Sequence, residues 1–377
     1  MLMLKKFVFI IFLLVIVNGY SQLTPITKNT RVSVLTVGTA DESHSLYGHT
    51  AIRINDNTTG FDFIYNYGMF DFQTENFVLK FVKGDMQYFA AAYPYSDFEY
   101  SYRIENRSIF EQVLNLSLEE KEKLFEKLGA SLNPDTKFYT YKFIDRNCTT
   151  KVVDVLNEVL QKKPIVNRIS DNKKTYRTVL YPYAIDHFYQ KLGINIIFGS
   201  KVDQQDSKIF LPFDLYENLK NTTYRGKPLV TESTTLFAAN RTKPGFSFLD
   251  SIYSLIGILL LFIIFKSEKI TLFFFGVLGF LGLFFIWAGL YSFHEELLWN
   301  YNVFLFNPLY LFLIYFIVKN NLKWIKITSI LCLGFLVIYL LYMLNKVHFP
   351  IVLPIVVTSV FLLVKVIQKN NLLPSVK

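Results

Sequence analysis

Cys148 is the residue of this 377-residue chain best placed for nucleophilic chemistry. It follows an aromatic segment that alternates as a strand would, residues 139–143, and it precedes apolar residues at helical spacing, 152–159. A thiol at the start of a helix faces unpaired backbone N–H groups and the positive end of the helix dipole, which favour the thiolate. The thiolate is the form that attacks acyl carbonyls. The alternative interpretation is a buried structural cysteine, because Cys148 continues the apolar stripe of its helix.

A cysteine nucleophile needs a base within hydrogen-bond reach, and His49 is the best candidate. It opens a predicted strand directly after Gly48, where an imidazole can be presented at the edge of a sheet. His44 lies in the preceding loop, and His187 follows a region of weak structural signals. The alternative for His49 is a histidine that is capped or merely satisfied by hydrogen bonds.

A third polar group usually holds the base in one tautomer. Asp62 and Asn66 lie on the same face of the next predicted strand, and we favour Asp62 for this role. For the oxyanion, the donors are either Asn147 or the backbone N–H groups at the helix start.

The elements that must position these residues can be read from the same pattern. Residues 31–37, a strand opened by His49, and residues 61–67 predict a meander of short antiparallel strands. Ser117 and Glu120 have the spacing of a capping box, which predicts a helix that runs to about Ala130.

Both ends of the chain carry membrane-related signals. Lys5 and Lys6, an apolar run at 7–17 and a cleavage site after Ser21 are typical of a secretory signal peptide. Long apolar stretches toward the other end predict five membrane spans, at about 246–265, 270–290, 301–318, 324–344 and 350–367. We therefore divide the chain into a signal peptide (1–21), an exported domain (22–244) and a transmembrane domain (245–377).

The distribution of charge gives the orientation of the spans. Most lysines after residue 246 fall in alternate loops and in the tail, which predicts that those segments are cytoplasmic and that the exported domain lies across the membrane. The net charge of +9 comes mostly from these lysines and the signal peptide, so the exported domain is near neutral. It has no dense basic patch of the kind that a nucleic-acid-binding protein needs.

Four motifs, taken in order, resemble one known family. They are residues 46–53 (LYGHTAIR), 65–72 (YNYGMFDF), 111–116 (EQVLNL) and 147–150 (NCTT). The chain is similar in these motifs to the DUF4105 family, also called the Lnb N-terminal periplasmic domain. The resemblance implies an α+β exported domain with a circularly permuted papain-like fold of the NlpC/P60 type, in which histidine precedes cysteine, followed by an all-α bundle of about five transmembrane helices.

The resemblance also implies a function. Membrane-anchored members of the family include a bacterial lipoprotein N-acyltransferase, so we expect a thiol-dependent acyltransferase of the bacterial cytoplasmic (inner) membrane, with its N-terminal domain on the periplasmic side. Its acyl donor would be a phospholipid and its acceptor a lipoprotein; we expect no cofactor, no metal and no nucleic acid. A cysteine peptidase or amidase acting on peptidoglycan is the alternative, and a non-enzymatic membrane scaffold is the third hypothesis. The several spans favour lipid chemistry, and the combination of Cys148 with His49 argues against a scaffold.

Candidate substrate contacts come from the same motifs. Arg53 and Tyr67 lie within them, and His294 lies in a polar loop, residues 293–309, that resembles a family loop between two spans. This loop could position a lipid head group or the acceptor amine, or His294 could simply cap the end of a span. The aromatic run at residues 88–98 could line an acyl chain, although such runs are more often core.

Overall fold

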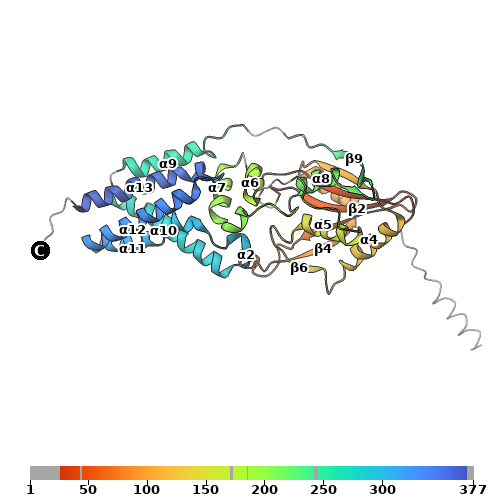
Figure 1. Ribbon diagram of the computed structural model, residues 1–377, viewed down its shortest axis with the longest axis horizontal. Coiled ribbons are helices and arrows are strands. Elements are labelled where there is room, and N and C mark those ends of the chain that lie inside the picture. Colours follow the sequence, from red (N-terminus) through yellow and green to blue (C-terminus); the bar gives the residue numbers. More distant parts are fainter. Residues whose placement is uncertain are drawn as a thin grey trace, which may run out of the picture.

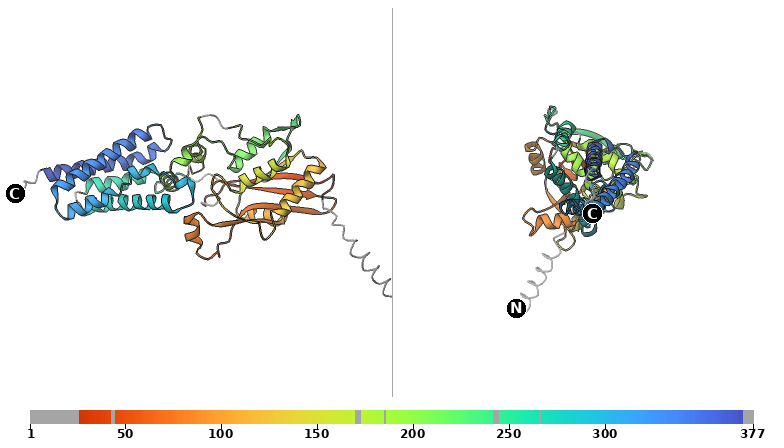
Figure 2. Two further views of the ribbon diagram at one scale, coloured as in Figure 1. Left: turned by 60° about the horizontal axis from the view of Figure 1, so that its bottom comes forward. Right: turned by 90° about the vertical axis from the view of Figure 1, so that its left-hand side faces the viewer.

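The chain forms a sheet domain and a helical bundle that lie end to end (Figure 1). The computed structural model describes residues 26–42, 45–169, 173–184, 186–241, 245–265 and 267–371. The predicted signal peptide, 1–21, lies outside these ranges, as does His44. Two helices, α6 (Tyr176–Leu180) and α7 (Phe188–Ile197), lie between the domain and the bundle, and Figure 2 shows the same arrangement from other directions.

One antiparallel sheet organises the first domain. Its seven strands have the order β6-β4-β3-β2-β1-β5-β9, and the three strands predicted in the first 70 residues are confirmed as neighbours in it. The short strands β7 and β8 form a separate pair. The strands are β1 (Arg31–Val37), β2 (His49–Asp56), β3 (Phe61–Met69), β4 (Gln87–Pro94), β5 (Ile109–Leu114), β6 (Phe138–Thr140), β7 (Thr223–Tyr224), β8 (Lys227–Pro228) and β9 (Val230–Phe237).

Helices cover both faces of this sheet. On one face α5 (Cys148–Val159) packs on β2 and β3, with α4 (Leu118–Ala130) and α8 (Pro212–Lys220) beside it, whereas α3 (Tyr95–Ile104) packs on β3 and β4. Six consecutive residues of β1 are buried because alternate side chains enter two different apolar clusters. The helix predicted from Ser117 is α4, and its capping box is confirmed.

The predicted acyl-chain wall at residues 88–98 is divided by this geometry. Tyr88 is buried in the cluster under α5, together with Met86. Tyr93, Tyr95 and Phe98 belong to the cluster under α3. Residues of opposite parity on β4 point to opposite faces, so the run does not form one continuous wall.

The second part of the chain is a helical bundle whose segments are strongly apolar. Among the residues that the structure describes, four segments are long and apolar enough to cross a membrane: Glu268–Tyr291, Glu295–Val318, Leu322–Met343 and Phe349–Asn370. The second of these combines two 3₁₀ turns with α11. The helices of the bundle are α9 (Ile252–Ile264), α10 (Glu268–Tyr291), α11 (Leu309–Val318), α12 (Leu322–Met343) and α13 (Phe349–Asn371).

The first predicted span, 246–265, contains a shorter helix than expected. Its helix α9 has 13 residues, a length of about 20 Å at 1.5 Å per residue, against a hydrocarbon core of about 30 Å. The preceding residues are not helical, and Asp250 among them accepts a hydrogen bond from the backbone N–H of Tyr189 in α7, at 3.0 Å. The chain is thus held beside α7 until α9 begins.

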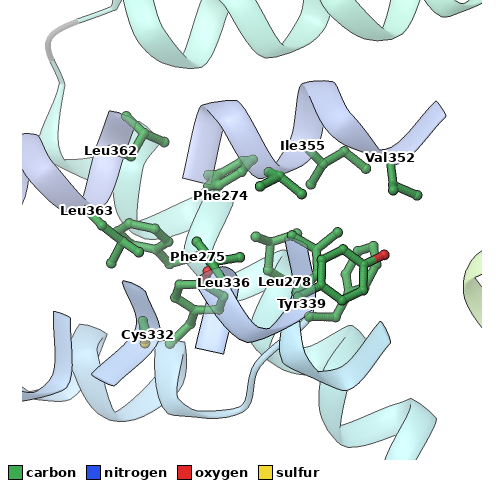
Figure 3. Close-up of a cluster of buried hydrophobic side chains, with 14 of the residues drawn as sticks. Phe274, Phe275, Leu278, Cys332, Leu336, Tyr339, Val352, Ile355, Leu362 and Leu363 are labelled. Atoms are coloured by element: carbon green, nitrogen blue, oxygen red, sulfur yellow. The ribbon is translucent and has the colours of Figure 1, made fainter. Parts of the chain in front are cut away.

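The core of the bundle comes mainly from α10, α11, α12 and α13, and α7 and α9 add a few side chains to it. Figure 3 shows the part formed by α10, α12 and α13. The rings of Phe275 and Tyr310 stack with their centroids 5.0 Å apart. Cys332 lies in this core with 1% of its surface exposed, so it is far less accessible than the partly exposed Cys148. Both cysteines are free thiols.

One end of the bundle, which we call the sheet-facing end, docks on the first domain through the loop of residues 292–308. Ser200 donates its backbone N–H to the Leu298 carbonyl at 3.2 Å, and Gly199 donates to the Glu296 carbonyl at 2.7 Å. A β-carbon on Gly199 would lie only 1.9 Å from the Leu298 carbonyl oxygen. The approach of the two backbones therefore requires glycine at this position.

A buried polar cluster fixes the same contact. Arg177 of α6, 2% exposed, donates to Asp203 at 2.8 Å and to the carbonyl groups of Asn195, Phe198 and Gly199. Asp203 also accepts a hydrogen bond from the Tyr301 hydroxyl at 2.8 Å and pairs with Lys346 at 3.3 Å. The bundle residues Tyr301 and Lys346 thus complete the partners of a carboxylate that belongs to the first domain.

We predict that Gly199→Ala weakens this docking. The added methyl group must displace the loop backbone, and overpacking of this kind costs about 1 to 3 kcal/mol. The measurement is the thermal unfolding of the full-length protein in detergent, in which the variant should melt below the wild type. Gly193→Ala is the control, because its β-carbon would meet open space in the helix α7, where alanine stabilises by about 0.5 to 1 kcal/mol. Equal melting temperatures for the two variants would contradict the prediction.

Candidate active site

Cys148 is the first residue of α5, as the sequence predicted. Asn147 caps this helix: its side chain accepts from the N–H of Thr150, and the Thr150 hydroxyl accepts from the Asn147 N–H. The preceding strand β6 is shorter than the predicted strand at 139–143, because the chain turns at Lys142 and pairs that residue with Arg146. This turn directs the chain into the helix start and leaves the thiol at its first turn.

The thiol lies directly against the sheet. A β-carbon on Gly68 would be 3.4 Å from the Cys148 β-carbon, so the helix start approaches the backbone of β3 as closely as van der Waals contact permits. Gly68 also has φ = +87°, a conformation that other residues adopt at a cost. It lies at an irregularity in the pairing of β3 with β4, between Asn66 and Met69.

His49 is the first residue of β2, and its side chain interacts with the Cys148 thiol. Its Nε2–H donates to the Asn66 side-chain oxygen at 2.6 Å. That hydrogen bond leaves Nδ1 as the ring nitrogen available to the thiol. The structure therefore brings together the thiol and the imidazole that the sequence singled out.

The electrostatics of the pair favour separated charges. Burial alone would lower the pKa of His49, but the negative charge of Cys148 and hydrogen bonds with Cys148 and Asn66 raise it above the ordinary value. Burial alone would raise the pKa of Cys148, but the charge of His49 and hydrogen bonds from His49, from the Thr50 backbone N–H and from the Thr149 hydroxyl lower it. Each group thus stabilises the charged form of the other.

Asn66, and not Asp62, orients the imidazole. The amide nitrogen of Asn66 donates to the Tyr93 hydroxyl at 2.7 Å, which fixes its oxygen toward His49. Asp62 instead forms a two-fold hydrogen-bonded ion pair with Arg53, at 2.7 and 2.8 Å. The preference for Asp62 was wrong because it lies opposite Asn55, whereas Asn66 lies opposite Ala51, two residues from His49. The two side chains share a face of β3 but lie about 13 Å apart along it.

Three other predicted residues are occupied elsewhere. Asn147 cannot donate to an oxyanion, because its amide nitrogen donates to the carbonyl groups of Phe143 and Phe210, both at 2.8 Å. The Thr150 N–H is taken by the Asn147 cap, so the N–H groups of the first two residues, Cys148 and Thr149, are the donors that the helix start can provide. Arg53 pairs with Asp62 and with Glu111, and its guanidinium lies 3.5 Å from the centre of the Tyr95 ring.

Tyr67 is likewise not available to a substrate. It is 1% exposed, and its hydroxyl lies 3.0 Å from the Ser131 hydroxyl at the end of α4. Its assignment as a substrate contact finds no support in this geometry.

The loop of residues 292–308 contacts the active-site region through Glu296 and not through His294. His294 donates Nε2–H to the Phe81 carbonyl at 2.8 Å, in the helix α2 (Phe77–Lys83). Glu296 is 2% exposed, and its carboxylate accepts the backbone N–H of Ile144, four residues before Cys148, at 3.2 Å. Its other oxygen has no hydrogen-bond partner among the described residues. The sequence signal that could have revealed Glu296 is the pair of acidic residues in a short loop between apolar segments.

The arrangement can form and stabilise a covalent acyl intermediate. A thiolate, an adjacent imidazolium and an amide that fixes the imidazole are the three parts that nucleophilic acyl transfer by cysteine requires. Within the described part of the chain, no three His, Cys, Asp or Glu residues are grouped so that they could hold a metal ion.

Comparisons with known proteins find a match for the segment of the chain that contains this site. Residues 22–181 match the family described as the Lnb N-terminal periplasmic domain, which confirms the resemblance of the four sequence motifs. The matched segment contains Cys148, His49 and Asn66, and it ends before the helical bundle. The chain matches no curated protein and no solved structure.

We predict that Cys148 is alkylated by iodoacetamide at a lower pH than an ordinary thiol, because its pKa is lowered and the thiolate is the reacting form. His49→Ala removes the charge and the hydrogen bond that lower this pKa, so the reaction profile should move to higher pH. On the acidic side of the profile, a rise of about 1 in the thiol pKa slows alkylation about tenfold. The measurement is the modification rate of the Cys148 peptide, by mass spectrometry, in a Cys332→Ser background. An unchanged profile in the His49→Ala protein would exclude the ion pair.

We also predict that Asn66→Ala moves the same profile to higher pH, in the direction of His49→Ala but by less. The hydrogen bond from His49 to Asn66 raises the pKa of the imidazole, so its loss makes the imidazolium a weaker partner for the thiolate. Asp62→Asn is the matched control, because Asp62 contacts Arg53 and not His49. An equal or larger change of the profile in the Asp62→Asn protein would restore Asp62 as the orienting group.

Proposed function

Taking residues 22–181 as an Lnb N-terminal periplasmic domain, we propose that this protein is a membrane-anchored cysteine acyltransferase. It moves a fatty acyl chain from a phospholipid, through a thioester on Cys148, to the amino-terminal amine of diacylated lipoproteins. The observation that carries the proposal is the interacting pair of Cys148 and His49 in a domain docked on an apolar helical bundle. The sheet domain would then be a permuted papain-like fold of the NlpC/P60 type.

In the first half of the proposed reaction, the Cys148 thiolate attacks the ester carbonyl of the phospholipid. The oxyanion forms near the first-turn N–H groups of α5, and its collapse breaks the bond to the glycerol oxygen. His49, as the imidazolium, donates its proton to this leaving oxygen. The products are a lysophospholipid and a thioester on Cys148.

In the second half, the amine of the lipoprotein attacks the thioester carbonyl. His49, now neutral, accepts the proton of the amine, and Cys148 leaves as the thiolate. The hydrogen bond to Asn66 keeps the same ring nitrogen directed at the reacting atoms in both halves. The thiolate and imidazolium pair is regenerated with the amide product.

The bundle supports a location in the bacterial cytoplasmic membrane. The lysines at or near the end of the bundle away from the sheet domain favour a cytoplasmic location for that end under the positive-inside rule. Those that lie among the described residues are Lys269, Lys319, Lys323, Lys326, Lys365 and Lys369. Lys346 lies at the opposite end, where its charge is paired with Asp203. This orientation puts the sheet domain in the periplasm and makes α9 the first of five passes, although α9 is short.

Cys148→Ser should abolish acylation of lipoprotein amino termini, because a hydroxyl has a pKa too high for His49 to offset. The measurement is mass spectrometry of lipoproteins from cells that carry the wild type or the variant as their only copy. A wild-type adduct on Cys148 that hydroxylamine releases, and that the variant lacks, is the expected thioester. Cys332→Ser is the control and should retain full activity, because Cys332 is buried in the bundle.

The same cells separate the alternatives. If wild-type and Cys148→Ser cells have identical lipoproteins but differ in their cell-wall fragments, the protein is a peptidase or amidase acting on peptidoglycan. If neither lipoproteins nor fragments differ, the scaffold hypothesis replaces both.

A further inference from the structure

The helix α2 exposes apolar side chains although it lies outside the bundle. None of its seven residues is buried, and Val78 and Leu79 are each 68% exposed. Phe81 is also exposed, and Phe72, in the turn before α2, is 69% exposed. An isolated helix of this length is unstable in water, and soluble surfaces rarely group so many apolar side chains.

Hydrogen bonds to its last residues hold α2 beside the end of α10. The Lys83 carbonyl accepts from the N–H of Phe293 at 2.6 Å, and the Val82 carbonyl accepts from the Ser292 hydroxyl at 2.9 Å. His294 completes the contact through the Phe81 carbonyl. All three partners directly follow the end of α10, so α2 lies at the level of the sheet-facing end of the bundle, as Figure 1 shows.

The bundle itself exposes large apolar and aromatic side chains at this level. Leu290 is 85% exposed at the end of α10, and Trp299 is 84% exposed in the loop that follows. Tyr291 and Phe293 are exposed beside them. Aromatic side chains of this kind are enriched at the interface between a membrane and water, so the apolar surface of α2 continues that of the bundle.

The charges near α2 are of both signs. The helix itself contains no acidic residue, and Lys80 and Lys83 lie in its last turn, but Lys83 pairs with Asp85 at 2.9 Å, and Asp71 and Glu75 are exposed in the turn before the helix. Lys80 is exposed, and Lys142 approaches the same corner by donating to the Phe293 carbonyl. The exposed apolar side chains therefore carry the inference, and they are typical of segments that lie in the head-group region of a bilayer; Lys80 is the exposed cation beside them.

We propose that α2 inserts its exposed apolar side chains, with Phe72, into the outer leaflet of the membrane and that its binding partner is the phospholipid surface itself. The inference rests on the membrane orientation given under the proposed function. It goes further by assigning a second membrane contact to the periplasmic domain, outside the bundle. Lys80 lies beside the lipid phosphates, and α2 fixes the height of the sheet domain above the bilayer.

Packed aromatic rings would connect the membrane contact of α2 to the region of the Cys148 thiol. Phe77 of α2 lies 6.0 Å from Phe70, Phe70 lies 5.2 Å from Tyr88, and the Tyr88 ring stacks on Tyr141 at 4.4 Å between centroids. Burial raises the pKa of the Tyr141 hydroxyl, and the negative charge of the nearby Cys148 thiolate raises it further. The helix α2 is therefore positioned to hold the nucleophile near the depth at which phospholipid esters lie.

The experiment measures the depth of single fluorescent labels in the full-length protein. Cysteines replace Val78 or Leu79 in a Cys148→Ser, Cys332→Ser background, are labelled with an environment-sensitive dye, and are reconstituted into phosphatidylglycerol and phosphatidylcholine vesicles that contain a spin-labelled quencher lipid. Leu290→Cys reports insertion of the bundle. Asn57→Cys is the negative control, since it is exposed in the β2–β3 turn at the opposite end of the strands.

We expect strong quenching at positions 78, 79 and 290 and none at position 57. If position 290 is quenched while 78 and 79 behave like 57, the bundle is inserted but α2 stays in water, and the inference is overturned alone. If position 290 is not quenched, the membrane orientation itself is wrong, and the inference falls with it. These two failures are therefore distinguishable.

Discussion

The contact between the first residue of α5 and the first residue of β2 is the constraint on which the rest of the sheet domain depends. Cys148 and His49 can interact only if the helix begins at the end of the sheet where β2 begins. Asn147 fixes the start of the helix, and Gly68 adopts a positive φ of 87° where β3 passes the helix start, a conformation that other residues adopt at a cost. Burial opposes each charge separately, so the ion pair forms only because both groups reach this position together.

The same end of the sheet is the one that docks on the bundle, so positioning of the thiol and positioning of the domain are coupled. The carboxylate of Glu296 accepts the N–H of Ile144, in the turn that leads into the Cys148 helix. Removing water from a carboxylate is costly, and this one has a partner for only one of its oxygens among the described residues. A displacement of the loop that carries Glu296 would therefore reach the turn before Cys148 directly. The polar cluster of Arg177 and Asp203 limits such displacement, since bundle side chains complete its hydrogen bonds.

Local signals in the sequence predicted the elements of the site, and non-local contacts decided the rest. Helical spacing and a strand start located Cys148 and His49, because both depend on neighbours in the sequence. The alternation of side chains along a strand predicts the face on which a residue lies but not the residue opposite it on the next strand. It could therefore not show that Asn66, and not Asp62, lies near His49. The proposed role of Asn147 at the oxyanion fails because its amide nitrogen already donates to the carbonyl groups of Phe143 and Phe210, and the second of these lies 63 residues away in the sequence. The length of the apolar stretch also predicted a longer first helix than the structure has. The helix α9 begins only after Asp250, whose carboxylate accepts a hydrogen bond from Tyr189 of α7.

The distribution of polar groups along the axis of the molecule supports one direction of approach for a substrate. Cys148 lies at the helix end that points toward the bundle side of the sheet domain, beside the turn that contacts Glu296. The exposed helix α2 lies at the same level of the bundle, and its aromatic contacts lead back to Tyr141. The opposite end of the strands carries the exposed turn between β2 and β3 and the polar contacts of Asp56 with Thr27 and Thr30. The nucleophile and α2 thus share the end of the sheet domain that faces the bundle, and the exposed β2–β3 turn lies at the other end.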